Sequence, residues 1–359
     1  MTNMPEGGAI VYCEDAFNTP NGKTAHGLVR FTVRYDVLAV VDSVHAGSDA
    51  GEVLDGRPNG IPVVAGLKQG MEAAKAANKA ATHMVVGLAP DGGRLSPAAR
   101  ADVKKAIELG LNVDSGLHDF LSDDPAFAKL AAANGIQIRD VRKPPSRDEC
   151  HFFSGKIEEV TSVKVALLGT DSAVGKRTTA WKLVTALHEM GYTAELVGTG
   201  QTAWLQGARY SIMLDSLIND FVTGELEHAV HSAWSFSTPD VIVIEGQGSL
   251  LNPAYPGGFE IMAATRPDAI VLQHAPARRD YDGFPGYPIQ PLAQQIDAVE
   301  KITGQRNVVA ITVNHEDLPK EDIDCTCRSI HMITGLPVAD PLVHTMEPVL
   351  KALRRFIER

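Results

Sequence analysis

Short apolar stretches alternate with amphipathic stretches along most of the chain, and this pattern predicts strands followed by helices. In the first part, β-branched apolar stretches predict strands at 9–13, 35–42, 61–65, 83–88, 111–114 and 136–139. Stretches rich in Ala, Leu, Lys and Glu predict helices at 67–79, 97–109 and 125–134. Strands that alternate with helices of this length are typical of βαβ units in a parallel sheet.

The alternation is interrupted once, between residues 142 and 161, where Pro144 and Pro145 exclude a helix or a central strand. It then restarts, so we expect two α/β domains, 1–145 and 146–359, each built on a doubly wound parallel sheet. The second domain has predicted strands at 164–169, 193–198, 241–245, 269–274, 308–314 and 336–339, and predicted helices at 176–190, 212–232, 292–303, 321–334 and 347–358.

Net charge and composition exclude several classes of protein. The 359 residues carry a net charge of −11, which argues against binding to a nucleic-acid backbone and suits an enzyme of small metabolites. We find no run of 18 apolar residues and no secretory signal pattern, so we expect a cytoplasmic protein without a membrane span. The four cysteines are too few for a disulfide scaffold and lack the paired spacing of a metal site, so we expect no metal.

The strongest motif lies between residues 163 and 192, where an apolar strand, a loop and Gly175-Lys176 at a helix start follow one another. Such a loop directs backbone N–H groups at a phosphate, and the helix dipole and the lysine add positive charge. The combination favours a phosphate site over an ordinary turn. The predicted contacts are Gly169, Thr170, Asp171, Ser172, Ala173, Val174, Gly175, Lys176, Arg177, Thr178 and Thr179.

This loop departs from the common G-x-x-x-x-G-K-[ST] pattern in two ways. Gly169 is one residue further from the lysine, a spacing that resembles dethiobiotin synthetase and MinD-like proteins. Arg177 stands where nucleotide hydrolases have a hydroxyl that binds Mg²⁺, and Thr178 lies about 100° further around the helix. With Lys176 and Arg177 as cations, the loop is suited to a pyrophosphate that is held and not cleaved.

Further candidates follow other predicted strands, at the sheet edge where parallel sheets bind ligands. Glu245 precedes the glycine-rich loop 246–248, where an acid binds a magnesium-bound water, acts as a base or caps the next turn. Gln201, in another glycine-rich segment, is either a substrate-binding residue or part of a flexible turn. Asn314 lies where P-loop relatives contact the base of a nucleotide, although an acidic helix start explains the same residues.

Two adjacent arginines, Arg278 and Arg279, follow the strand that ends at His274. Paired arginines bind carboxylates through parallel hydrogen bonds, and they also occur as solvated surface charges. The sequence pattern leaves both interpretations open.

Longer segments extend the comparison with known proteins over both halves: GTDSAVGKRTTA, GTGQTAWLQG, EGQGSLLNPAYPGG, HAPARRDYDGFPGYPI, LAPDGGRLS and GLHDFLSDDP. With these segments the chain resembles the DgcN-type D-glutamate N-acetyltransferase family, which joins a Rossmann-like N-terminal half to a P-loop C-terminal half. The resemblance includes the junction DVRKPP. It implies acetyl transfer from acetyl-CoA to the amino group of D-glutamate in D-amino-acid catabolism, with acetyl-CoA as co-substrate.

Acetyl transfer to an amine requires a base, because an α-ammonium is mostly protonated at neutral pH. Glu245, His274 and Asp215 are the candidates in that order, and the N–H groups of loop 246–248 are suited to the oxyanion. The carboxylates of the substrate need Arg278, Arg279 or Arg142.

Two other functions stay open. The loop spacing and Glu245 favour an ATP-dependent kinase or ligase of the dethiobiotin-synthetase type, against which Arg177 argues. A MinD-type regulatory switch without chemistry is the third hypothesis. We expect small-molecule partners only, and a homo-oligomer with a dimer as the first hypothesis.

Overall fold

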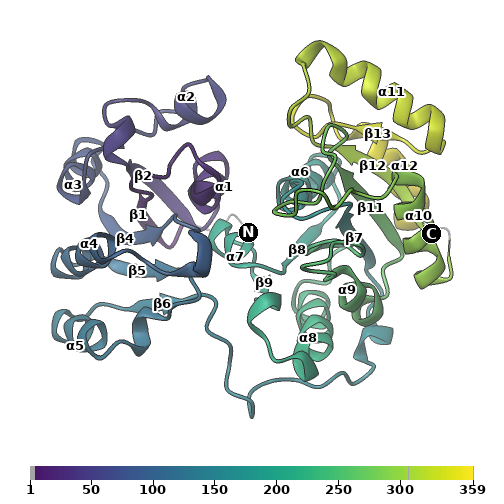
Figure 1. Ribbon diagram of the computed structural model, residues 1–359. Helices are drawn as coiled ribbons and strands as arrows, with labels where there is room; N and C mark the ends of the chain where they lie inside the picture. The colour runs from purple at the N-terminus through teal and green to yellow at the C-terminus, as the bar shows by residue number, and fades with distance from the viewer. Residues whose placement is uncertain (1–4, 306, 359) are drawn as a thin grey trace. The chain divides into compact units, whose positions relative to one another are not determined.

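The computed structural model describes residues 5–305 and 307–358 and divides into two compact units. The first unit contains the chain up to Pro144 together with Gln201–Gly207, and the second contains Pro145–Gly200 and the chain from Ala208 onwards. Each unit is built on one parallel sheet with helices packed on its faces (Figure 1). The predicted α/β class is therefore confirmed.

The first unit has the strand order β3-β2-β1-β4-β5-β6, and every pairing is parallel. The chain reverses direction across the sheet between β1 and β4, as in a Rossmann-like fold. The strands are β1 Gly7–Tyr12, β2 Tyr35–Val41, β3 Val63–Val64, β4 Ala81–Val86, β5 Asn112–Ser115 and β6 Ile138–Asp140. The helices are α1 Lys23–Arg30, α2 Ala50–Asp55, α3 Leu67–Ala76, α4 Pro97–Glu108 and α5 Pro125–Asn134.

A helix from the second half of the sequence completes this unit. The helix α7, Gln201–Gln206, lies in the chain between two strands of the second sheet but packs with the first unit. Leu205 is fully buried in the first unit's core, and the Gln206 amide donates a hydrogen bond of 2.8 Å to the carbonyl of Gly27. The sequence pattern gave no indication of this arrangement.

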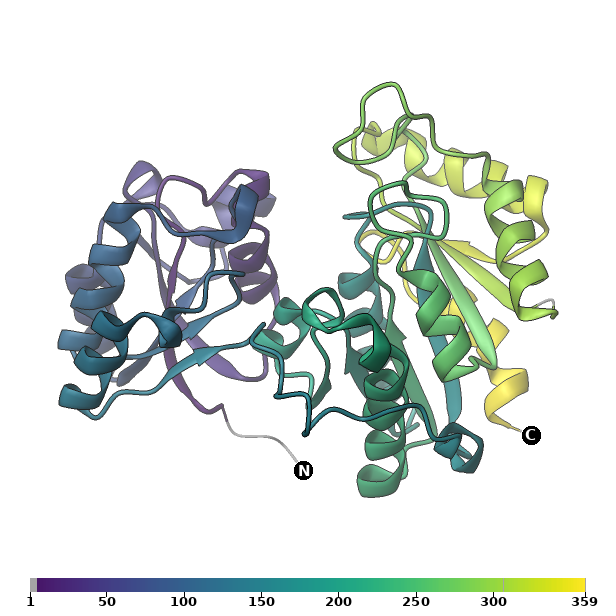
Figure 2. The same cartoon turned by 60° about the horizontal axis from the view of Figure 1, so that its bottom comes forward.

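The second unit has the strand order β13-β12-β11-β7-β10-β8-β9, again with parallel pairings. Figure 2 shows the sheet and helices of this unit from a second side. The strands are β7 Val163–Gly169, β8 Ala194–Gly198, β9 Tyr210–Ser211, β10 Val241–Glu245, β11 Ala269–His274, β12 Val308–Val313 and β13 Val338–Ala339. The helices are α6 Lys176–Glu189, α8 Asn219–Ser237, α9 Gly258–Thr265, α10 Leu292–Thr303, α11 Ile323–Thr334 and α12 Glu347–Ile357. This is the P-loop NTPase-like arrangement expected from the sequence.

One predicted helix, 212–232, is wrong at its start, because α8 begins only at Asn219. The N–H groups of Ile212 and Leu214 donate instead to the carbonyls of Gly198, the last residue of β8, and of Thr199, at 2.9 and 3.2 Å, so this segment extends the edge of the sheet. Four short helices, α1, α2, α7 and α9, were not predicted, since their few residues give too little periodicity.

The central strands of the second unit are apolar and buried along their whole length, because helices cover both faces of the sheet. Polar side chains therefore gather where the strands end. Parallel strands end at one edge, which brings the loops after β7, β8, β10, β11 and β12 together. Among the described helices, none is both long and apolar enough to span a membrane.

Candidate functional site

The loop between β7 and α6 lies at the centre of this edge, because β7 is flanked by β10 and β11. Gly175 has a φ of 98°, a left-handed conformation that favours glycine just before the helix begins. A Cβ on Gly175 would lie 3.9 Å from the amide nitrogens of both Asn314 and Gln273. The predicted contact Asn314 is thus brought close to the end of the phosphate loop.

Lys176, the first residue of α6, is buried and its ammonium is held by backbone carbonyls. It donates to the carbonyl of Asp171 at 2.7 Å and to that of Gly248 at 2.8 Å. Burial lowers the pKa of Lys176 to about 8. The lysine therefore connects the phosphate loop to the loop that follows β10.

The carboxylate of Asp171 fixes the shape of the loop from inside. It is fully buried and accepts hydrogen bonds from the N–H of Ser172 at 2.7 Å and the N–H of Asp282 at 2.8 Å. The amide of Asn252 and the guanidinium of Arg278 also donate to it, each at 2.8 Å. Four donors already occupy this carboxylate, so we do not expect it to contact a ligand directly. Its role is to hold the backbone of the phosphate loop in position.

The guanidinium of Arg278 makes hydrogen bonds to several groups of the protein. Besides Asp171, it donates to the carbonyl of Ser172 at 2.7 Å and to both carboxylate oxygens of Glu316 at 2.8 and 3.0 Å. Arg279, the next residue, is exposed. The role of either arginine in binding a substrate carboxylate stays a prediction, and these contacts make Arg279 the better candidate.

Glu245 ends β10, next to the phosphate strand, and is 5% exposed. Its carboxylate accepts a hydrogen bond of 2.8 Å from the N–H of Thr199. Burial raises the pKa of Glu245 above its ordinary value, while the charges of Arg177 and Lys176 act in the opposite direction. A carboxyl group with a raised pKa beside a ligand edge is suited to proton transfer.

His274 ends β11, on the other side of β7 from Glu245. Its Nδ1 lies 3.0 Å from the hydroxyl of Thr170 in the phosphate loop, and burial lowers the pKa of the imidazole to about 4. His274 is therefore neutral at pH 7. Asp215, the third predicted base, is exposed on the turn Leu214–Ser216 after β9.

Two predicted substrate-binding residues belong to the first unit, whereas the others lie in the second. Arg142 is buried and its Nε donates a hydrogen bond of 2.7 Å to the carbonyl of Gly116. A Cβ on Gly116 would lie 2.5 Å from Cγ of Gln201, so the side chain of Gln201 packs against the same glycine. Both residues therefore meet at the loop that follows β5.

The sequence analysis missed Gln273, which organises the floor of the site. Its amide oxygen accepts hydrogen bonds of 2.6 Å from the hydroxyls of Thr179 and Thr312. The predicted contact Thr179 is therefore buried against the protein. A glutamine within the apolar strand Ala269–His274 was the available signal, since a buried amide needs partners.

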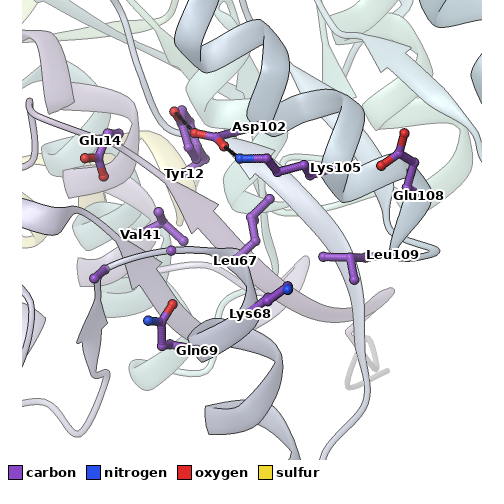
Figure 3. A pocket seen from close by; sticks show the side chains of 12 residues that line it. Tyr12, Glu14, Val41, Leu67, Lys68, Gln69, Asp102, Lys105, Glu108 and Leu109 are labelled. Atoms are coloured by element: carbon purple, nitrogen blue, oxygen red, sulfur yellow. Dashed lines mark hydrogen bonds and ion pairs between the residues drawn. The ribbon is translucent and has the colours of Figure 1, made fainter.

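A pocket of about 620 Å³ lies in the first unit, near the ends of β1 and β2 (Figure 3). On its wall, the hydroxyl of Tyr12 and the ammonium of Lys105 both donate to Asp102 at 2.9 Å. None of these residues was singled out by the sequence. Within the described part of the chain, no group of three or more His, Cys, Asp or Glu side chains is placed to hold a metal.

Two family models match the chain, one over each half. Residues 151–350 match a model described as "Domain of unknown function (DUF1611_C) P-loop domain", and residues 43–144 match the corresponding Rossmann-like domain, DUF1611_N. The chain belongs to the DUF1611 family. A crystal structure of a DUF1611 family protein from Anabaena variabilis superposes with a TM-score of 0.89 at 27% identity, covering 98% of this chain and 100% of that one.

Two relatives of this DUF1611 protein carry the name D-glutamate N-acetyltransferase. The protein from Tritonibacter scottomollicae is 31% identical over 293 residues, which cover 79% of this chain and 84% of that protein. The protein from a Pseudoalteromonas species is 30% identical over 304 residues, or 82% of this chain and 88% of that protein. The family suggested by the sequence segments is therefore confirmed, and members of it are named as acetyltransferases.

Proposed function

We propose that this protein transfers an acetyl group from acetyl-CoA to the amino group of D-glutamate. The observation that carries the proposal is a phosphate loop in which Arg177 follows Lys176 in the sequence, in a chain related to proteins named D-glutamate N-acetyltransferase. Coenzyme A contains a pyrophosphate, so a phosphate loop can hold it without cleaving it. Two cations at the helix start suit such a ligand without a metal ion.

The backbone of the loop would hold the pyrophosphate, with Lys176 donating to one of its oxygens. Gly175 allows the backbone to approach closely, because it has no side chain in the way. Lys176 would exchange a carbonyl partner, Asp171 or Gly248, for a phosphate oxygen. A charged acceptor gives the stronger hydrogen bond, so the exchange favours binding.

Acetyl transfer requires a neutral amine, and Glu245 is the first candidate to remove the proton. The base takes a proton from the ammonium, the amine attacks the thioester carbon, and the carbon–sulfur bond breaks as the adduct nitrogen loses a second proton to the departing thiolate. His274 and Asp215 are the alternative bases. His274 is neutral but weakly basic, and Asp215 is exposed, which supports Glu245.

The oxyanion formed during attack would be stabilised by N–H groups of loop 246–248, which follows Glu245. The carboxylates of D-glutamate would be bound by arginines, for which Arg279 and Arg278 of the second unit are candidates. Arg142 and Gln201, which belong to the first unit, stay predicted substrate contacts. We keep the homodimer and the cytoplasmic location as predictions.

A second function, an ATP-dependent kinase or ligase, is favoured by the spacing of the phosphate loop and by the position of Glu245. An acid at the end of a strand beside the phosphate strand is where such enzymes bind Mg²⁺ through water. Arg177 in place of a magnesium-binding hydroxyl argues against it.

One assay distinguishes these functions. The protein is incubated with D-glutamate and either acetyl-CoA or ATP with Mg²⁺, and the products are identified by mass spectrometry. We expect N-acetylglutamate and free coenzyme A from the first mixture only. A phosphorylated product with ADP would support the kinase, and no product in either mixture would contradict both proposals.

A further inference from the structure

Beyond the residues considered so far, the loop after β12 carries a histidine that is held by a buried carboxylate. Nδ1 of His315 lies 2.6 Å from Oδ2 of Asp340, whose side chain is fully buried at the end of β13. The other oxygen of Asp340 accepts a hydrogen bond of 2.9 Å from the N–H of Leu342. The imidazole itself is 29% exposed, so it can reach a ligand.

The hydrogen bond between His315 and Asp340 determines which ring nitrogen of His315 carries the hydrogen and which has the free lone pair. A carboxylate only accepts hydrogen bonds, so Nδ1 carries the hydrogen and donates it to Asp340. The neutral imidazole then has its lone pair on Nε2. In its neutral form, His315 therefore presents an acceptor, held by Asp340, at the ligand edge of the sheet.

The loop that carries His315 is joined to the phosphate loop on both sides of the histidine. Asn314 precedes it, with its amide nitrogen 3.9 Å from the position of a Cβ on Gly175. Glu316 follows it and pairs with Arg278, which also binds Asp171. His315 is thus held within the surroundings of a ligand bound at this loop.

Strand order places His315 and Glu245 on opposite sides of the phosphate loop. The order β12-β11-β7-β10 puts three strand spacings between them, or about 14 Å. A pyrophosphate held over β7 has one substituent on each side. If the thioester lies at Glu245, the nucleoside lies toward β12.

We propose that Nε2 of His315 accepts a hydrogen bond from the amino group of the adenine in the nucleotide half of coenzyme A. The inference rests on the proposed function, because it takes Glu245 to mark the thioester side. An acceptor held in this way distinguishes adenine, which offers an amino group, from hypoxanthine, which offers a carbonyl oxygen at the same position. Asp340 sets this preference through the hydrogen on Nδ1.

The test compares binding of ADP and IDP, which share the pyrophosphate and differ at that position of the base. Calorimetry with the wild type should give tighter binding of ADP by roughly tenfold. In Asp340→Asn, the new amide keeps its oxygen on the N–H of Leu342 and donates its N–H to Nδ1. The hydrogen of His315 then moves to Nε2, so the preference should reverse in favour of IDP.

His315→Leu removes the acceptor, and its preference for ADP should disappear. Asp324→Asn is the matched control, since Asp324 is paired with the neighbouring His344 at 2.8 Å, and it should retain the wild-type preference. The ratio of the two affinities is measured on one preparation, so partial unfolding does not imitate the result.

Equal binding of ADP and IDP by the wild type, or an unchanged ratio in Asp340→Asn, would overturn the assignment of His315 while leaving acetyl transfer intact. The failure of the proposed function has a different signature. In that case acetyl-CoA is not consumed with D-glutamate, whichever nucleotide the protein prefers.

Discussion

The buried ammonium of Lys176 donates a hydrogen bond of 2.8 Å to the backbone carbonyl of Gly248. If the same ammonium contacts the pyrophosphate, Lys176→Ala should weaken coenzyme A binding by about ten- to hundredfold, because a hydrogen bond to a charged group contributes about 1.5–3 kcal/mol. Calorimetric titration measures this loss. Lys182→Ala, on the exposed side of the same helix, should bind like the wild type. Unchanged affinity in Lys176→Ala would remove the phosphate-loop assignment.

The lowered pKa of Lys176 predicts how binding depends on pH. Only the protonated lysine attracts phosphate, so affinity for coenzyme A should fall as pH rises above about 8, and binding at higher pH should be coupled to proton uptake. Titrations at pH 8.5 in two buffers of different ionisation enthalpy measure that uptake. In Lys176→Ala the uptake should be absent.

The same residue affects folding stability with a defined sign. The unfolded chain binds the proton of Lys176 up to its ordinary pKa of 10.5, whereas the folded chain releases it near 8. Between these values the unfolded state holds more protons, so this group makes the free energy of unfolding rise with pH. Urea denaturation of wild type and Lys176→Ala at pH 8 and pH 10 isolates this contribution as a difference between the two proteins.

Glu245→Gln should lower kcat by about 10²–10⁴-fold with a small effect on the KM for acetyl-CoA, since the amide keeps the shape but accepts no proton. The wild-type rate should rise with pH through one ionisation, and the variant should lose that ionisation. A structural role for Glu245 predicts the reverse: a lower melting temperature and an intact pH profile. Glu189→Gln, exposed at the end of α6, serves as the control.

The adjacent arginines should behave differently when each is replaced by alanine. Arg278→Ala leaves Asp171 buried without its cationic partner, so the free energy of unfolding should fall by about 2 kcal/mol. Arg279→Ala, at an exposed position, should leave stability unchanged and raise the KM for D-glutamate. Thermal melts and steady-state kinetics on both variants test this. Equal stability of the two variants would contradict the structural role of Arg278.

Activity should survive chelation by EDTA, because Arg177 stands where a magnesium-binding hydroxyl would be needed. The rate of acetyl transfer is measured before and after dialysis against the chelator, with a magnesium-dependent kinase treated alongside. Loss of turnover that Mg²⁺ restores would contradict metal-free chemistry and favour the kinase.

The sequence was sufficient to predict the central strands and the long helices. The strands Val241–Glu245 and Ala269–His274 and the helix Leu292–Thr303 were predicted at their observed bounds, because an apolar strand or an amphipathic helix repeats its pattern several times. The start of α8 was predicted wrongly, since Ile212 and Leu214 have an apolar spacing compatible with a helix. Their backbone hydrogen bonds to the end of β8 are tertiary contacts that no local pattern reveals.

The candidate site likewise contains residues that the sequence pattern indicates and residues that it does not. The sequence was sufficient to propose the phosphate loop and Glu245 as candidates, because the strand, glycine and charge pattern is contiguous in the sequence. The hydrogen bonds of Asp171 and Arg278 within the protein were not predictable from the sequence. Their partners Asn252, Asp282 and Glu316 come from three different loops. Asp340 likewise gave no signal, since its partner His315 lies 25 positions away.

The helix α7 has a consequence for how the chain is made. Leu205 is part of the first unit's core, so the first 144 residues alone cannot complete that core. During synthesis the core stays incomplete until residue 207 has left the ribosome. By then β7, α6 and β8 of the second sheet have also been made. A fragment that ends near residue 145 therefore has an uncovered apolar surface, because the first unit completes its core only with a segment encoded between two strands of the second sheet.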